Sequence, residues 1–414
     1  MKFLLVILIS IITGSAYAQK AITLEECYNL VTKNYPLAKQ TQLLENQYQL
    51  DAEAIAATKL PQLNLGAQAT YQSDVIEIPV SSVAPLNKDQ YRATLSANQL
   101  IYNGGLTNAS LHLKSAQLKT KQKQIEVSLY QLKQQINQLY FSILLAQESE
   151  LLLKAKQSQL EAKLKEVVSG IKYGVILPAS DNVLKAELLK ISQQLLELKS
   201  NKTALIETLS SLINKPLPSS TLFQNPSIET QLQDDLNRPE LELFQLKKEE
   251  IAQSETLISK QNAPQLSGFA TGGYGNPGLN MLDNSFQTFY TVGVKLNWNV
   301  FDWNSKKKQR QSLAINKEIV DTETETFKLN TNIELNKQQK EIEKIQAIIT
   351  SDEAIINLRK EVLQTADSQL KNGVITSSDY ITELTNLYQD ENTLVRHKIQ
   401  LQLAKANYNI IKGQ

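Results

Sequence analysis

Residues 106–169 read LTNASLHLKSAQLKTKQKQIEVSLYQLKQQINQLYFSILLAQESELLLKAKQSQLEAKLKEVVS, without a glycine or a proline. An apolar side chain occupies every seventh position of a long series: Leu111, Leu118, Ile125, Leu132, Leu139, Ala146, Leu153, Leu160 and Val167. Such a period predicts an α-helix that packs lengthwise on neighbouring helices with a left-handed supercoil. At about 1.5 Å per residue, the helix predicted over 105–171 is on the order of 100 Å long. Few soluble folds need an element of this length.

A second stretch of the same kind covers residues 305–372, which again contain no glycine or proline. Its apolar period is kept by Ile342, Ile345, Ile349, Ile356, Leu363, Ala366 and Leu370. We therefore predict a second long helix over 305–371. On the helices alone, a solvated coiled-coil spacer is a competing interpretation.

The first 18 residues have the pattern of a secretory signal peptide: Lys2, an apolar run over 3–12, and Ala16-Tyr17-Ala18 as a cleavage site. The apolar run is too short to cross a bilayer as a helix. The chain has 43 basic and 42 acidic residues, and Lys2 lies in the leader, so the mature chain is formally neutral. Neutrality argues against nucleic acid as a partner. Cys27 is the only cysteine, which excludes an intrachain disulfide.

Between the leader and the first long helix, the sequence predicts one helix and two strands. Thr23 and Glu26 have the spacing of a capping box, so a helix should begin there and extend to about residue 59, with a break near Asn34-Tyr35-Pro36. Residues 61–71 and 91–102 alternate apolar and polar side chains, as strands with two different faces do. After the long helix, a glycine-bounded turn leads into a return helix over about 181–214.

The second half of the chain repeats the first. Asn237-Arg238-Pro239 matches Asn34-Tyr35-Pro36 at an offset of 203, and Tyr290 matches Tyr91 at an offset of 199. Gaps confined to loops are typical of a duplicated structural unit. The predicted repeats are 19–218 and 237–414, joined by a connector over 219–236. In the second repeat, the matching elements are strands 264–274 and 289–301, long helix 305–371 and return helix 379–412.

The strand over 289–301 has one apolar and one polar face, which suits lipid on one side and water on the other. Its predicted lipid-facing residues are Val292, Val294, Leu296 and Trp298. A half-buried soluble sheet would show the same alternation. However, four strands cannot close a barrel, and an open edge in lipid leaves backbone groups unpaired at several kcal/mol each. Membrane insertion therefore requires the strands of several chains to close together.

Taken in order, these features resemble the TolC family of outer-membrane efflux and secretion channels. The resemblance rests on the two-fold repeat, on the strand-to-helix joints at 100–105 and 300–303, and on the hairpin tips at 173–181 and 372–379. It implies a mainly α-helical homotrimer with a membrane β part, in which a twelve-stranded β-barrel is continued by a periplasmic α-barrel of twelve helices. The second joint lacks the pair Gly104-Gly105, which leaves its turn geometry open.

The resemblance also implies two functional regions. The tips would dock on a periplasmic adaptor protein, and the matching residues are Tyr173, Gly174, Val175, Asp181, Asn372, Gly373 and Val374. Family members can carry two acidic rings that constrict the tunnel entrance. Asp379 matches the first ring, whereas the second falls on Thr382, with Glu383 one residue further. A helix N-cap is the alternative role for Asp379 and for Asp181.

The sequence offers little for an enzyme. Only His112 and His397 are present, so we expect no histidine-based catalysis, no metal site and no cofactor. The function implied by the resemblance is passive: a trimeric outer-membrane exit duct of a tripartite efflux or type I secretion system, supplied by an inner-membrane pump and its adaptor. The alternative is a periplasmic adaptor or coiled-coil spacer without a pore. Two helical hairpins and membrane-like strands favour the duct.

Overall fold

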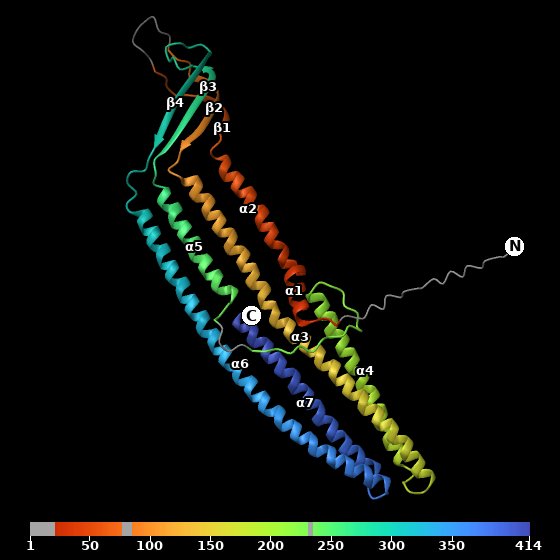
Figure 1. Cartoon of the computed structure of the whole chain (residues 1–414). Coiled ribbons are helices and arrows are strands. Elements are labelled where there is room, and N and C mark those ends of the chain that lie inside the picture. Colours follow the sequence, from red (N-terminus) through yellow and green to blue (C-terminus); the bar gives the residue numbers. More distant parts are fainter. Residues whose placement is uncertain (1–20, 77–84, 231–234) are drawn as a thin grey trace, which may run out of the picture. The chain divides into compact units, whose positions relative to one another are not determined.

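The computed structural model describes residues 21–76, 85–230 and 235–414 (Figure 1). The predicted signal peptide at 1–18 lies outside the described residues, as do 77–84 and, within the connector, 231–234. The first repeat contains α1 (Leu24–Asn34), a 3₁₀ turn (Pro36–Ala38), α2 (Lys39–Ala57), β1 (Gln62–Tyr71), β2 (Asp89–Tyr102), α3 (Leu106–Lys172) and α4 (Ser180–Leu212). The second contains α5 (Pro239–Lys260), β3 (Gln265–Asn276), β4 (Gln287–Asn297), α6 (Ser305–Lys371) and α7 (Ser377–Lys412).

This element order confirms the predicted fold class, a mainly helical chain with two repeats of helix, two strands, long helix and return helix. The long helices α3 and α6 have 67 residues each. The capping box at the start of α1 is formed: the backbone N–H of Glu26 donates to Thr23 Oγ1 at 3.1 Å, and that of Thr23 donates to Glu26 Oε2 at 3.0 Å. Because proline has no N–H and restricts the residue before it, the first helix ends ahead of Pro36.

The strand β4 ends at Asn297, four residues before the predicted limit, so Trp298 lies beyond the strand. Pairing between β3 and β4 ends at Gln265 and Asn297. The residue before Gln265 is Pro264, which has no N–H to continue the ladder. The indole Nε1 of Trp298 instead donates to the backbone oxygen of Asn262, at 3.0 Å, in the connection between α5 and β3.

The chain forms two compact units. One comprises the chain up to Ala38 with 128–238 and 330–414, and is built from helices and the connector. The other comprises 39–127 and 239–329, and contains the sheet together with α2, α5 and the N-terminal parts of α3 and α6. Both long helices therefore contribute residues to both units.

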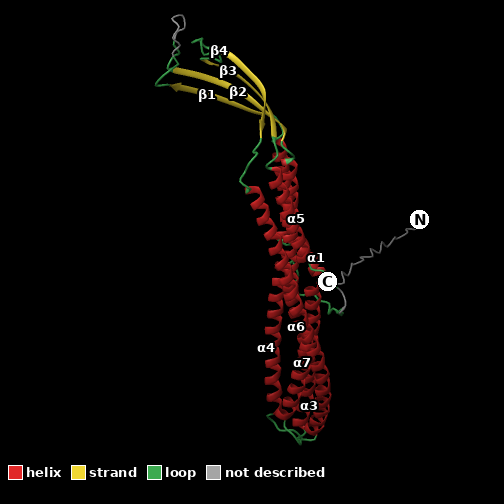
Figure 2. Ribbon diagram, turned by 90° about the vertical axis from the view of Figure 1, so that its left-hand side faces the viewer, coloured by secondary structure: helices red, strands yellow, loops and turns green. Residues whose placement is uncertain are grey.

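The sheet has the order β1-β2-β3-β4, and each neighbouring pair is antiparallel. Figure 2 shows the four strands side by side in one curved sheet. The two hairpins of the repeats meet through β2 and β3, where Ala97 lies opposite Ala270. Within the described chain, β1 and β4 each have a neighbour on one side only, so both edges of the sheet are open.

The helical unit has two main apolar cores. The first gathers side chains of α1, α3, α4, α7 and the connector around Tyr140, whose hydroxyl lies 2.6 Å from the backbone oxygen of Gln224. Phe223 of the connector is also buried there, and Gln147 bonds its backbone N–H and oxygen. The connector, predicted to have little structure, is thus anchored although its described part contains no helix. The second core joins α3, α4, α6 and α7 near the hairpin tips.

Candidate functional site

Both hairpin tips begin with the same helix-ending motif. Gly174 and Gly373 have φ values of +75° and +69°, a left-handed conformation that glycine adopts without a steric penalty. The next residue in each tip, Val175 or Val374, donates its backbone N–H to the residue five positions earlier, at 2.9 Å in both cases. This is the Schellman arrangement, which satisfies carbonyls left free at a helix end. The matching sequences of the two tips therefore fold alike.

The two return helices begin differently. In α7 the N-cap is Thr376, and Asp379 completes a capping box: Asp379 Oδ2 accepts from the Thr376 N–H at 2.9 Å and from its hydroxyl at 2.7 Å. In α4 the N-cap is Ala179, without a side-chain cap. Asp181 lies in the first turn and pairs with Lys185 at 2.7 Å. Neither aspartate is itself an N-cap, so the alternative prediction of an N-cap role is wrong for both Asp181 and Asp379.

The tips expose several large apolar side chains. Tyr173 is 75% exposed, Leu177 67% and Val374 69%. The tips also lie close together, since a Cβ added to Gly373 would come within 2.9 Å of the backbone oxygen of Val175. Seven residues predicted for docking thus lie in two adjacent turns or the helix ends beside them: Tyr173, Gly174, Val175, Asp181, Asn372, Gly373 and Val374.

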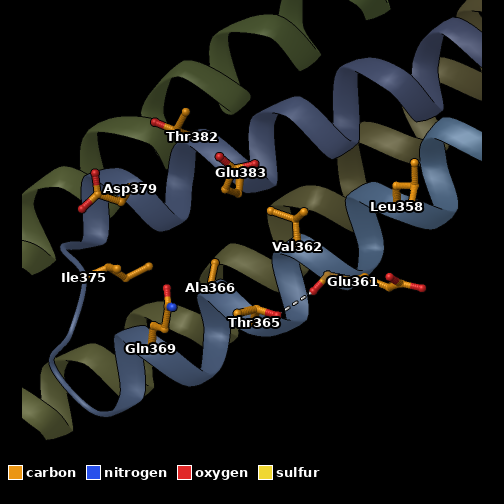
Figure 3. Close-up of a pocket in the computed structure, with 10 residues that line it drawn as sticks. All are labelled: Leu358, Glu361, Val362, Thr365, Ala366, Gln369, Ile375, Asp379, Thr382 and Glu383. Atoms are coloured by element: carbon orange, nitrogen blue, oxygen red, sulfur yellow. Dashed lines mark hydrogen bonds between the residues drawn. The ribbon is translucent and has the colours of Figure 1, made fainter.

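Next to the second tip, α6 and α7 enclose an open groove of about 610 Å³ (Figure 3). All three predicted constriction residues, Asp379, Thr382 and Glu383, line it. Figure 3 shows Glu383 of α7 and Val362 of α6 facing each other across the groove. The remaining lining residues are Leu358, Glu361, Thr365, Ala366, Gln369 and Ile375.

The groove is acidic, and its carboxylates differ in their partners. Hydrogen bonds from the Thr376 hydroxyl and backbone N–H lower the pKa of Asp379, which keeps this exposed carboxyl ionised. Glu383 lies 3.5 Å from the guanidinium of Arg359, which also pairs with Asp390 at 3.0 Å. Glu361 has no ion-pair partner among the described residues. Glu361 could not be predicted from the sequence as a groove residue, because its place beside Asp379 depends on how the two helices pack.

Behind the tips, a buried lysine joins the two hairpins. Lys163 of α3 is 6% exposed, and its ammonium pairs with Asp367 of α6 and with Glu166 of its own helix. It also lies 5.4 Å from the ring centroid of Tyr380 in α7. Burial lowers the pKa of Lys163, but hydrogen bonds to the two carboxylates outweigh it and raise the pKa overall. A lysine within a heptad helix gave no signal of this role in the sequence.

The strand register assigns side chains to the two faces of the sheet, because directly paired residues share a face. Val292, Val294 and Leu296 of β4 lie on the face that also carries Leu63 and Leu65 of β1. Val292 is 71% exposed and Leu65 82%. The other face is mainly polar, although it also carries Leu100, Phe269 and Phe289. It carries among others Asn64, Gln68, Gln90, Arg92, Thr94, Ser96, Asn98, Ser267, Thr271, Gln287, Thr291, Lys295 and Asn297.

The strand-to-helix joints of the two repeats both have two successive residues with positive φ, although only the first joint contains glycines. Gly104 and Gly105 have φ values of +64° and +83°, and the matching Trp303 and Asn304 have +54° and +60°. At the first joint, glycine is required, since a Cβ on Gly104 would lie 1.9 Å from that of Ala263. At the second, Trp303 is held in a conformation that is costly for a bulky residue.

Comparisons with known proteins identify the fold. No protein-family model and no curated protein matches the chain. Among solved structures, CusC matches over 94% of this chain and 92% of its own, with a TM-score of 0.69 and 12% identity. The outer membrane protein VceC of Vibrio cholerae matches over 94% and 96%, with a TM-score of 0.65 and 16% identity. The MtrE outer membrane channel of Neisseria gonorrhoeae matches over 94% and 89%, with a TM-score of 0.66 and 14% identity.

The chain has the fold of the TolC-family outer-membrane channels. The resemblance predicted from the sequence is confirmed at this level. TolC-family channels are trimeric transport proteins that are not enzymes. Among the residues described here, no helix is long and apolar enough to cross a membrane, and no group of three or more metal-binding side chains is present.

Proposed function

We propose that this chain is the subunit of a passive, trimeric outer-membrane duct that releases solutes delivered by an inner-membrane transporter and a periplasmic adaptor. The observation that carries the proposal is the sheet: four strands with one apolar and one polar face, and two open edges. Because unpaired backbone groups in lipid cost several kcal/mol each, such a sheet is stable in a bilayer only when further copies close it. Three copies give a twelve-stranded barrel with the apolar faces in lipid and the polar faces around a water-filled lumen.

The proposed assembly assigns the acidic groove to the tunnel entrance. Three copies of Asp379, Thr382 and Glu383 would surround the lumen, and Glu361 would add a further carboxylate. A ring of carboxylates in a narrow pore favours cations. The capping box supports this role, because it keeps Asp379 ionised and fixes its side chain at the start of α7.

The tips are the proposed docking surface for the adaptor. Exposed apolar side chains at Tyr173, Val175 and Val374 support this, since apolar groups on an exposed turn mark interaction sites. Cys27 is fully buried, and burial raises the pKa of its thiol to about 12. A Val374→Cys variant therefore carries a single reactive thiol, and a cross-linker attached there should capture an adaptor in intact cells. A matched thiol at Lys340, exposed on α6, should not.

The first experiment is to fractionate expressing cells and to run the outer-membrane fraction on a gel with and without boiling. The proposal predicts an outer-membrane oligomer that dissociates on heating, and discrete conductance steps when the purified protein is added to a planar bilayer. N-terminal sequencing of the mature protein should begin at Gln19, after removal of the leader. A soluble periplasmic monomer would overturn the duct and favour the adaptor or spacer.

A further inference from the structure

The joint that leads from β4 into α6 exposes two aromatic side chains. Trp303 is 81% exposed and Phe301 64%, and their ring centroids lie 4.8 Å apart in an edge-to-face arrangement. Trp303 also has a φ of +54°, which is a costly conformation for a bulky residue. A strained backbone that presents an uncovered indole is typical of a surface that contacts something outside the chain.

A run of basic side chains follows directly. The helix α6 begins with Ser-Lys-Lys-Lys-Gln-Arg over 305–310. The matching start of α3, Leu-Thr-Asn-Ala-Ser-Leu over 106–111, has no charged residue. Trp303 in turn occupies the position that matches Gly104. Neither the tryptophan nor the basic run is therefore needed to build such a joint, because the first repeat forms its own joint without them.

The four basic side chains of this run differ in their partners. Lys306 and Arg310 bond to side chains in and directly after the last turns of α5. Lys307 and Lys308 are exposed, and neither forms an ion pair with any residue in the described part of the chain. Two uncompensated ammonium groups therefore lie within five residues of the exposed indole.

The positive charge extends along the end of the sheet at which the long helices begin. Six lysines and arginines but only one carboxylate, that of Asp302, occur in the segments that join strands to helices, with the adjoining helical turns: 57–61, 103–112, 258–264 and 298–310. Asp302 accepts from the backbone N–H of Lys306 at 3.1 Å and so caps α6. At the other end of the sheet, one lysine and two aspartates occur in the described connections, 72–76, 85–88 and 277–286. The two ends of the sheet therefore differ in charge.

The proposed duct places this basic end at a membrane surface. Figure 1 shows α6 starting next to the end of β4. Since the apolar face of the sheet lies in lipid in the proposed barrel, residues just beyond the strand ends lie at the depth of the headgroups. Tryptophan is enriched at this depth. A lysine near an anionic lipid surface strengthens binding about fivefold.

We propose that residues 298–310 bind the headgroups of anionic phospholipids in the periplasmic leaflet of the outer membrane, with Lys307 and Lys308 on the phosphate and Trp303 in the interface. A zwitterionic headgroup is a poorer ligand, because its own ammonium group repels the lysines. The inference deepens the proposed function, on which it rests, by naming the lipid partner of the duct. Three copies of the chain would surround the barrel with a basic collar at this leaflet.

Tryptophan fluorescence reports on this segment alone, because Trp298 and Trp303 are the two tryptophans of the chain. The full-length protein is reconstituted into phosphatidylcholine vesicles that contain an equal fraction of brominated phosphatidylglycerol or of brominated phosphatidylcholine. Bromine on the acyl chains quenches a tryptophan that it contacts. We expect phosphatidylglycerol to bind about tenfold more tightly than phosphatidylcholine. The preference should largely disappear at high salt, since the screening length falls to about 3 Å at 1 M.

Paired substitutions test the two free lysines. In Lys307→Gln/Lys308→Gln the preference should fall to about twofold or less. Lys340→Gln/Lys344→Gln removes the same charge from exposed positions of α6 outside the segment and should keep the full preference. Equal loss in both variants, or no preference in the wild type, would overturn the proposal. Quenching by neither brominated lipid would overturn it too, and would mean that a second copy of the chain covers Trp303.

Conductance of the wild-type preparation separates this inference from the proposed function. The same vesicles are fused with a planar bilayer. A conducting channel without preference for the anionic lipid refutes the lipid site alone. Preference for the anionic lipid without any conductance supports the lipid site and refutes the duct.

Discussion

At the residue scale, the two tip glycines share a backbone conformation but differ in their surroundings. A Cβ on Gly174 would meet nothing within 4 Å, whereas one on Gly373 would lie 2.9 Å from the Val175 oxygen. Left-handed backbone costs a non-glycine residue about 1–2 kcal/mol. Gly174→Ala should therefore lose about that much stability, and Gly373→Ala more, measured as the shift in thermal midpoint by circular dichroism. Equal shifts would mean that the two tips are not in contact.

Asp379 should make the start of α7 sensitive to acid. Hydrogen bonds from Thr376 hold its pKa below the unfolded value, which is about 3.9. A depressed folded pKa contributes stability above the unfolded pKa, and that contribution is lost as the pH falls through the folded value. Amide exchange protection at 377–380, corrected for intrinsic rates, should be constant from about pH 7 to 5 and fall below about pH 4. An asparagine at this position has the same shape but does not titrate. If amide protection fell equally in Asp379→Asn, protonation of Asp379 would not be the cause.

Some of these local features were readable from the sequence and others were not. The capping box at Thr23 was predicted because threonine followed three residues later by glutamate is a direct local signal. Thr376 and Asp379 have the same spacing, so the sequence contains the signal for this second capping box as well, whereas the roles predicted for Asp379 are an N-cap or a ring residue. The left-handed backbone at Trp303 could not be predicted, because the local preference of tryptophan opposes it and the repeated joint imposes it.

At the scale of elements, the contact between α3 and α6 includes one buried ammonium beside the apolar core. Lys163 and Lys371 both pair with Asp367, but Lys163 has a side chain 7% exposed and Lys371 one 56% exposed. Lys163→Ala removes a buried ammonium together with both of its ion pairs, whereas an exposed pair contributes about 0–1 kcal/mol. We expect Lys163→Ala to cost about 2 kcal/mol in the free energy of unfolding and Lys371→Ala less than about 0.5 kcal/mol. Equal effects of the two variants in urea unfolding would refute this assignment.

The elements themselves were largely predictable, because heptads, glycines and alternation are local signals. The limits of α3 and α6 differ from the predicted ones by at most a residue. The end of β4 was misplaced, since its apolar alternation continues to Val300 while its partner strand stops after Pro264. Only the α7 side of the groove could be predicted, because Asp379, Thr382 and Glu383 are close in sequence. Glu361 and Val362 of α6 join them only through helix packing.

At the scale of the whole molecule, the two faces of the sheet distinguish a soluble chain from the proposed barrel. Val292 and Thr291 are neighbours on β4, in the middle of the ladder with β3, and they lie on opposite faces. In a soluble sheet with one face packed against a partner, a lysine at either position would alter the stability of a monomer. In a closed barrel, the same two substitutions place the charge in lipid or in lumen water.

This contrast gives the prediction that tests the assembly most directly. Val292→Lys should cost about 2–4 kcal/mol near the bilayer midplane, whereas Thr291→Lys should cost close to zero, because a lumen-facing lysine stays hydrated. The measurement is the amount of heat-dissociable oligomer in the outer-membrane fraction, with total protein as the reference. We expect the oligomer to be strongly reduced by Val292→Lys and retained by Thr291→Lys. The opposite order would place the polar face in lipid, and equal effects would mean that neither face contacts a bilayer.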